Sequence, residues 1–219
     1  MLAGVGTNDT RHTVELARAA EKAGASGLLV VSPYYSRPPQ AGLQAHVERV
    51  ASSTDLPVML YDIPGRTAVP FAPATLEALA AHPQVVAVKD AKDDLGATSW
   101  LVRETGLAVY SGTDQLNLPL LAIGGVGMVS VVSHVVTPQL VELVRAFDAG
   151  DVARARELHL QLQPVYRGMF RTQGVILAKA ALALQGTPVG PVRLPLVDAT
   201  DAERTLLAAE LAAGGVALA

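Results

Sequence analysis

The feature that most restricts the fold of this sequence is a short apolar run, rich in β-branched residues, that recurs between residues 2 and 132. The runs recur roughly every 20 to 30 residues and alternate with stretches of helical periodicity, as βα repeats do. Runs that are apolar on both faces are typical of parallel strands covered by helices. The five complete runs are Leu28–Val31, Val58–Tyr61, Val85–Val88, Leu107–Tyr110 and Met128–Val132, and Leu2–Val5 resembles the end of a sixth.

The stretches between and after these runs predict helices. Before the last run, helices are expected near residues 10–23, 42–52 and 73–81; after it, three consecutive helices are expected at 137–148, 151–167 and 173–185. We therefore predict an α/β fold with a partial (β/α) barrel body at residues 1–136. A C-terminal extension of three helices at 137–219 would pack on it as one structural unit.

The number of runs is low for a complete barrel. A (β/α)8 barrel has eight strands and ~250 residues, so we expect this chain to lack about the first two and a half strands. The alternative is a complete, open, doubly wound sheet. Its usual mark is a glycine-rich phosphate loop, and Gly4–Asp9 lacks the third glycine at the required spacing.

Composition excludes several classes of function. The 219 residues are 50% hydrophobic with a net charge of −3 and no basic block, which argues against disorder and against a nucleic-acid surface. The absence of cysteine removes disulfides and thiol nucleophiles and fits a cytoplasmic protein. The uncharged stretch from 115 to 141 contains glycine, proline, serine and histidine and is not expected to span a membrane. No histidines lie at metal-ligand spacing, so neither a metal nor a cofactor is predicted.

Lysine is scarce, and only one lysine directly ends an apolar strand. Lys89 follows Val85–Val88, where burial would disfavour the charged form and leave an amine able to attack a carbonyl. A structural ion pair with Asp90 or another nearby acid explains the position equally well. The other lysines are Lys22, Lys92 and Lys179.

Tyrosines and an arginine gather at the same strand ends. Tyr61 ends one run, and Tyr34 and Tyr35 follow another; a phenol there can carry protons to and from a carbinolamine. Ordinary packing is the alternative for each tyrosine. Arg66 lies on the loop after Tyr61, where its guanidinium suits a substrate carboxylate or is simply solvated.

These residues stand in motifs that resemble those of the dihydrodipicolinate synthase family, in the N-acetylneuraminate lyase superfamily of class I aldolases. The segment Y-D-I-P-G-R-T at Tyr61–Thr67, followed by Val88–Asp90, is the most specific part. The resemblance covers nearly the whole chain and implies a (β/α)8 barrel with a helical extension. The other matching segments are Ser32–Tyr35 with Pro38, Ser111–Asp114, Gly127–Val131 and Arg193–Pro195.

The resemblance also implies an activity and the residues that perform it. Lys89 would form a Schiff base with pyruvate, Tyr61 would relay protons, and Tyr35 would complete the relay in a neighbouring subunit. Arg66 would bind the carboxylate of aspartate-β-semialdehyde, and the backbone carbonyl of Val129 would line the pyruvate pocket. The product would be 4-hydroxy-tetrahydrodipicolinate, on the route to diaminopimelate and lysine, and the assembly a homotetramer built from two dimers.

One departure from the family pattern bears on activity. The family's Gly-Thr-Thr-Gly-Glu segment, whose threonines bind the pyruvate carboxylate, has no counterpart in this sequence. We expect that segment upstream of residue 1 and weak activity in the chain as given. Two alternatives remain: a related pyruvate aldolase or lyase acting on N-acetylneuraminate or a 2-keto-3-deoxy sugar acid, and an inactive fragment. Arg66 followed by Thr67 favours the synthase over the lyase.

Overall fold

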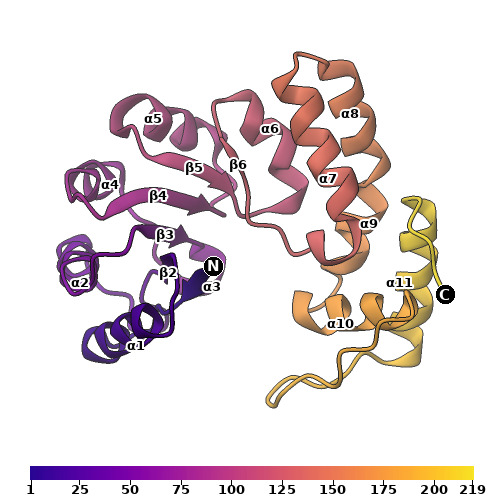
Figure 1. Cartoon of the computed structure of the whole chain (residues 1–219), viewed down its shortest axis with the longest axis horizontal. Helices are drawn as coiled ribbons and strands as arrows, with labels where there is room; N and C mark the ends of the chain where they lie inside the picture. Colours follow the sequence, from indigo (N-terminus) through magenta and orange to yellow (C-terminus); the bar gives the residue numbers. More distant parts are fainter. The chain divides into compact units, whose positions relative to one another are not determined.

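The computed structural model describes residues 1–219, and six parallel strands form its only sheet (Figure 1). The strands lie side by side in sequence order, which is the order of a barrel and not of a doubly wound sheet, whose order reverses at a switch point. The predicted α/β partial barrel is therefore confirmed. The strands are β1 Leu2–Gly4, β2 Gly27–Val31, β3 Val58–Asp62, β4 Val85–Asp90, β5 Ala108–Ser111 and β6 Gly127–Met128.

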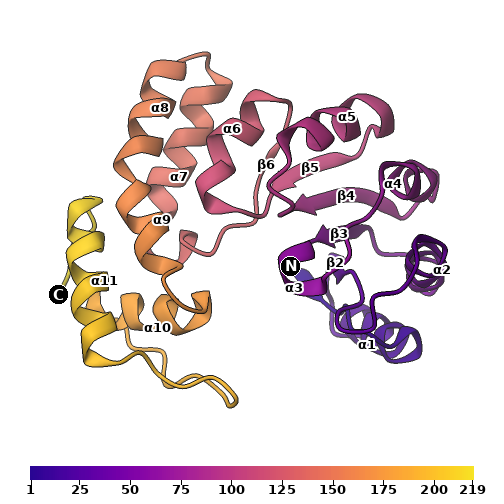
Figure 2. The ribbon, with the colours of Figure 1, turned by 180° about the vertical axis from the view of Figure 1, so that it is seen from behind.

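One face of the sheet is covered by helices. Each of the first four strands is followed by a helix on this face. Figure 2 shows the molecule from behind. The side chains between sheet and helices are fully buried, among them Leu28, Val30, Leu60 and Val88. The helices of this part are α1 Thr10–Lys22, α2 Gln40–Ala51, α3 Pro64–Thr67, α4 Pro73–Ala80, α5 Leu95–Thr105 and α6 Asn117–Ala122, with a 3-10 turn, η1, at Asp114–Leu116.

The opposite face of the sheet carries a different row of side chains. Because successive residues of a strand point to opposite faces, the strand register decides which side chains are neighbours. Val31 pairs with Tyr61, Tyr61 with Lys89, and Lys89 with Tyr110. The register thus aligns two tyrosines on either side of one lysine near the carboxyl ends of the strands.

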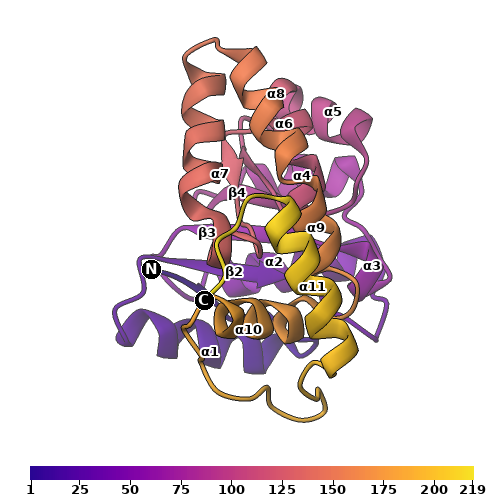
Figure 3. The same ribbon diagram turned by 90° about the vertical axis from the view of Figure 1, so that its right-hand side faces the viewer.

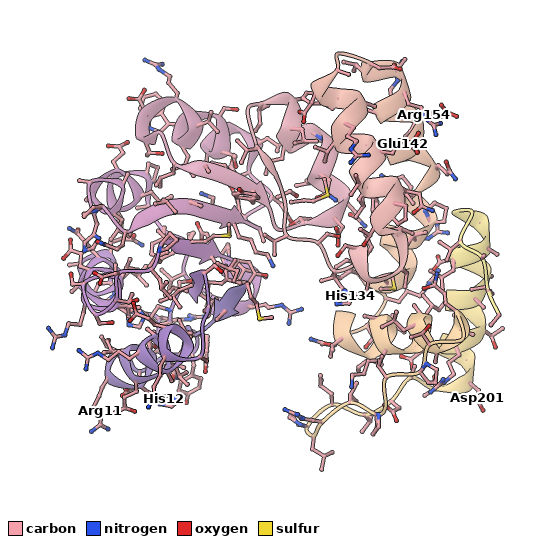
Figure 4. The ribbon with its side chains drawn as sticks, viewed as in Figure 1. Arg11, His12, His134, Glu142, Arg154 and Asp201 are labelled. Atoms are coloured by element: carbon pink, nitrogen blue, oxygen red, sulfur yellow. The ribbon has the colours of Figure 1, made fainter.

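The chain divides into two compact units, 1–129 and 130–219, and the secondary structure of the second consists only of helices. Figure 3 shows α9 and α11 lying side by side, and the buried Glu210 of α11 joins them by accepting hydrogen bonds from Arg167 and Arg171. On the surface, Arg154 of α8 pairs with Glu142 of α7 (Figure 4). The helices are α7 Ser133–Asp148, α8 Val152–Gln161, α9 Gln163–Met169, α10 Gly174–Leu184 and α11 Asp201–Ala213.

The expected extension of three helices is wrong in number, because the second unit has five. The helix expected at 151–167 is broken at Leu162, where Pro164 stands in the first turn of α9 and has no N–H to continue the α8 ladder. Helix α11 was not expected, although its first turn carries a capping box between Thr200 and Glu203.

The last strand is also shorter than expected. A strand was predicted over 128–132, but β6 ends at Met128, which pairs with Ser111, the last residue of β5. With β5 finished, residues beyond Val129 have no neighbour to extend the ladder. Helix α7 begins at Ser133 and is kinked at Val136, so the predicted start at Thr137 coincides with its second segment. The predicted domain boundary at 136/137 lies within this helix.

No helix of the structure has the length and apolar character needed to cross a membrane.

The sheet is open at β1 and β6, and its unpaired edge at β1 should promote association of the 219-residue polypeptide. Leu2 is 41% exposed on β1, whose outer edge has no strand beside it. Unpaired edges recruit strands of other chains, so we expect the mean mass measured by light scattering to rise with protein concentration.

A charge on that edge should oppose the association. Leu2→Lys is expected to lower the mass at each concentration, whereas Leu160→Lys, at an exposed position of α8, should not. Equal masses for Leu2→Lys and the unsubstituted chain would show that β1 is not the associating surface.

Candidate active site

Lys89 lies at the centre of the site, on the strand between β3 and β5. Its side chain is buried, with 8% of the residue exposed, and its Nζ stands 4.1 Å from the centroid of the Tyr61 ring. The backbone of Gly112 packs closely against the Lys89 side chain. A Cβ at position 112 would lie 3.0 Å from both Cε and Cγ of Lys89. The lysine is thus held between a phenol ring and a glycine.

Burial sets the charge state of this amine. The pKa of Lys89 is lowered, first because burial disfavours the ammonium and further by the positive charge of Arg66; Asp114 acts in the opposite direction. Burial likewise raises the pKa of Tyr61, with Arg66 opposing it. A neutral amine beside a protonated phenol is the pair needed to attack a carbonyl and then protonate its oxygen.

The structure decides against an ion pair between Lys89 and Asp90. Asp90 points to the helix side of the sheet, where its Oδ1 accepts a hydrogen bond from the Lys92 backbone at 2.9 Å and its Oδ2 accepts one from Thr98 Oγ1. Alternate residues of β4 face opposite ways, which keeps the two side chains apart. The structural explanation of Lys89 as the partner of Asp90 is therefore wrong.

A cavity of ≈ 590 Å³ lies over the β1–β3 part of the same strand ends. Tyr61 and Arg66 line it together with Tyr34 and Tyr35, so four of the candidate residues named from the sequence share one concave surface. Its volume is ample for a small organic acid. The remaining lining residues are Gly4, Gly6, Leu29, Val31, Ile63 and Thr67.

Arg66 and Tyr35 reach this cavity in different ways. Arg66 lies on the single-turn helix α3, which Thr67 ties down through its hydroxyl to the carbonyl of Ile63 at 3.0 Å. Tyr35 projects from the loop after β2 with 89% of the residue exposed and a backbone φ of 71°. A left-handed conformation is unfavourable for a residue other than glycine, so the loop holds Tyr35 outward at some cost.

Val129 lies elsewhere in the same unit. Its N–H donates to the carbonyl of Ser111 at 2.8 Å, directly after β6, and it does not line the cavity of Tyr61 and Arg66. Tyr61 thus links two groups: it contacts the Lys89 amine, and it lines the cavity with Arg66 and Tyr35, whereas neither Lys89 nor Val129 lines that cavity.

Two residues near the amine were not singled out from the sequence. Gly112 had only a weak signal, a glycine after a strand, and Asp114 was one acid among twenty. In the structure Gly112 packs against Lys89, and Asp114 is a buried acid whose charge acts on the lysine. Both stand in the Ser111–Asp114 segment.

A buried amine at the carboxyl end of a central parallel strand, beside a phenol, is typical of barrels of the class I aldolase type. Comparison with known proteins agrees. The model of the dihydrodipicolinate synthetase family matches residues 1–214. 4-Hydroxy-tetrahydrodipicolinate synthase 2 of Streptomyces coelicolor is 60% identical over 218 residues, covering 100% of this chain and 73% of that protein.

Two further relatives support the same assignment. The 4-hydroxy-tetrahydrodipicolinate synthase of Acidothermus cellulolyticus is 61% identical over 98% of this chain and 70% of its own length. The crystal structure of the lysine-bound dihydrodipicolinate synthase of Cyanidioschyzon merolae matches with a TM-score of 0.95 and 40% identity, over 99% of this chain and 74% of that one. The chain belongs to the dihydrodipicolinate synthetase family.

Gly112 offers a direct test of the site's geometry. Gly112→Ala would place a methyl group against Lys89 Cε, Lys89 Cγ and the carbonyl of Asp90, each 3.0 Å away. The lysine must then move, and we expect reductive trapping of a small α-keto acid on Lys89 to slow on the order of tenfold or more. Mass spectrometry of the reduced protein measures this rate.

Gly96→Ala is the matched control, because the new methyl group would meet only Asp94 Oδ1 at 3.4 Å. That variant should trap the keto acid at the unsubstituted rate. Unchanged trapping in Gly112→Ala as well would mean that the tight contact does not position the amine.

Proposed function

We propose that this chain carries the Schiff-base machinery for condensing pyruvate with aspartate-β-semialdehyde to 4-hydroxy-tetrahydrodipicolinate, a lyase reaction of lysine and diaminopimelate biosynthesis. The observation that carries the proposal is the Lys89 amine, buried beneath the Tyr61 ring with a lowered pKa. Membership of the dihydrodipicolinate synthetase family selects this reaction from those open to a buried lysine.

The first half of the reaction follows from the two groups in contact. The neutral Lys89 amine attacks the keto carbon of pyruvate and forms a carbinolamine. Tyr61 donates a proton to the oxygen of that intermediate, water leaves, and the iminium forms. The Tyr61 phenolate then takes a proton from the methyl carbon and so gives an enamine, the nucleophile that attacks the aldehyde carbon, and the phenol returns that proton to the new alkoxide. In the last step the amino group of the semialdehyde displaces Lys89 and closes the ring.

Arg66 is assigned to the aldehyde partner. It lies on the helix that follows Tyr61, lines the same cavity, and offers a planar fork of donors to a carboxylate. Its charge also lowers the pKa of Lys89. One side chain thus binds the second substrate and favours the neutral amine for the first.

Tyr35 is assigned to the site of a second subunit. Its exposure and left-handed backbone suit a side chain that acts beyond its own chain. We place it in the proton relay of a neighbouring copy, within a homotetramer built from two dimers. Val129 is assigned to the pyruvate pocket through its carbonyl, and its N–H, bonded to the carbonyl of Ser111, holds this residue beside the end of β5.

The lyase alternative has less support than the synthase. The relatives that match at 60% and 61% identity are 4-hydroxy-tetrahydrodipicolinate synthases, and Arg66 is present on the loop where the lyase pattern differs. The family's threonine segment remains absent from this sequence, so we expect weak binding of the pyruvate carboxylate and low turnover in the 219-residue chain.

Lys89 should be the only lysine to form the Schiff base. Incubation with pyruvate and borohydride is expected to add one pyruvyl group to the peptide that contains Lys89, because this amine is buried and its pKa is lowered by that burial. Peptide mapping by mass spectrometry identifies the site. Lys89→Ala should abolish both trapping and turnover at an unchanged melting temperature. Modification at Lys92 or Lys179 would overturn the assignment.

Arg66 should act on the second substrate more than on the first. We expect Arg66→Ala to raise the KM for aspartate semialdehyde by roughly one to two orders of magnitude, as loss of a charged, bidentate contact does. The rate of pyruvate trapping should change by less than about threefold, because burial, and not the charge of Arg66, is the main cause of the lowered pKa of Lys89. Kinetics with each substrate varied in turn measure both effects. An equal loss of trapping would make Arg66 a structural residue.

A further inference from the structure

A second row of polar side chains lies directly behind the proposed catalytic row. The residues that follow Tyr61 and Lys89 are Asp62 and Asp90, which pair with each other in the register of β3 and β4. Both point to the helix side of the sheet, and they are 0% and 3% exposed. Buried carboxylates are costly unless they are paired and hydrogen-bonded, so their partners are informative.

Lys92 is the partner of Asp62. Its Nζ lies 3.5 Å from Asp62 Oδ2, with 10% of the lysine side chain and none of the aspartate side chain exposed. Oδ2 has no other polar partner, and Oδ1 accepts from the backbone N–H of Phe71 at 3.3 Å. The ion pair therefore joins the end of β3 to the loop that follows β4.

The backbone of Lys92 is fixed at the same point. Its N–H donates to Asp90 Oδ1 at 2.9 Å, and the neighbouring N–H of Ala91 donates to the carbonyl of Asp62 at 2.9 Å. Asp90 in turn accepts from Thr98 of α5. One lysine thus bridges, by side chain and backbone, the two residues that immediately follow Tyr61 and Lys89.

We propose that Lys92 and Asp62 are positioning residues for the reaction, an ion pair that fixes the carboxyl ends of β3 and β4 so that the Tyr61 ring lies against the Lys89 amine. This inference rests on the proposed function. Adjacent strand residues share one peptide unit, so a rotation that releases the Asp62 side chain moves the Tyr61 ring on the opposite face. Displacements of about 1 Å are enough to cost large factors in rate.

The charged form of Asp62 depends on the nearby Lys92. The pKa of Asp62 is raised to about 6, first by burial and also by the charge of Asp90, while Lys92 and the Phe71 N–H lower it. Without Lys92, two buried carboxyls would face each other with no cation between them. Asp62 would then take up a proton or leave the interior, and either change frees the end of β3.

The Lys89 amine itself reports whether this happens. Burial is the main cause of its lowered pKa, with Asp114 and Arg66 as the leading charges. Lys92→Met removes a positive charge and Asp62→Asn a negative one, so their direct electrostatic effects on Lys89 have opposite signs. A rise of the Lys89 midpoint in both variants therefore signals a change of packing around the amine. This readout needs no substrate, so it does not depend on turnover of the chain.

The experiment is competitive acetylation of the full chain across a pH series, with each lysine quantified by mass spectrometry. Only four lysines are present, so Lys179 serves as an internal standard in every sample, and Lys22 in every sample except the Lys22→Met control. The variants are Lys92→Met, Asp62→Asn, the double substitution, and Lys92→Arg, with Lys22→Met as the control at an exposed position. Circular dichroism confirms that each variant is folded, and pyruvate trapping is measured alongside.

In the unsubstituted chain, the pH at which acetylation of Lys89 is half-maximal (its labelling midpoint) should lie below that of Lys22. Equal midpoints would refute the proposed role of Lys89 as the activated amine and would leave the proposal for the ion pair standing. In Lys92→Met and Asp62→Asn the Lys89 midpoint should rise towards that of Lys22, and trapping should slow on the order of 10- to 100-fold. The double variant should be no worse than the worse single variant, and Lys92→Arg should trap within about threefold of the original rate.

Folded single variants with an unchanged Lys89 midpoint and unchanged trapping would overturn the proposal and leave the ion pair a purely structural one. Additive losses in the double variant would also overturn it, because they would show that the two residues act separately. If Lys92→Met does not fold, Asp62→Asn and Lys92→Arg test the proposal, because each new side chain is close in size to the one it replaces.

Discussion

Removal of one amine from water is the constraint on which the site depends. Lys89 is buried at the end of β4, and its neutral form is favoured because the strand carries it out of solvent and the Tyr61 ring covers it. Neither contact is local in sequence. The tyrosine comes from β3 and the covering glycine from the loop after β5, so the nucleophile exists only when three parallel strands are paired in one register.

The two faces of these strands perform different tasks. The helix side is apolar along most of its length and becomes polar only at the last residue of each strand, where Asp62 and Asp90 stand. The other side carries Tyr61 and Lys89 one residue earlier. Because the period of a strand is two, the polar residues that bind the loops and those that perform chemistry alternate along the chain without competing for space.

Much of the fold could be predicted from the sequence, for identifiable reasons. Runs such as Val85–Val88 are buried strands because they are β-branched and bounded by turn residues, and their even spacing indicated parallel βα repeats. What failed depends on contacts the sequence does not display. Strand β6 stops where β5 stops, and helix α11 has a mixed pattern of exposed and buried residues that hides its capping signal.

The same contrast holds for the candidate site. Lys89 and Tyr61 could be found because each ends an apolar run, and Arg66 because it stands in a motif. Lys92 stands in the charged segment Asp90–Asp94, and nothing in that segment shows that its amine turns inward to a residue thirty positions earlier. Such a pair is specified by the strand register and becomes visible only once the sheet is assembled.

Two opposite charges act on the pKa of the Lys89 amine. Arg66 favours the neutral form of Lys89 and Asp114 favours the ammonium, so the net effect depends on how closely each approaches. A substrate carboxylate that binds Arg66 would partly neutralise its charge and weaken its effect on the amine. The enzyme class needs the amine neutral for attack on the keto acid, before the second substrate arrives. Because the first step consumes the free amine, the effect of Arg66 on its pKa matters before the aldehyde partner binds, and the two roles proposed for Arg66 do not conflict.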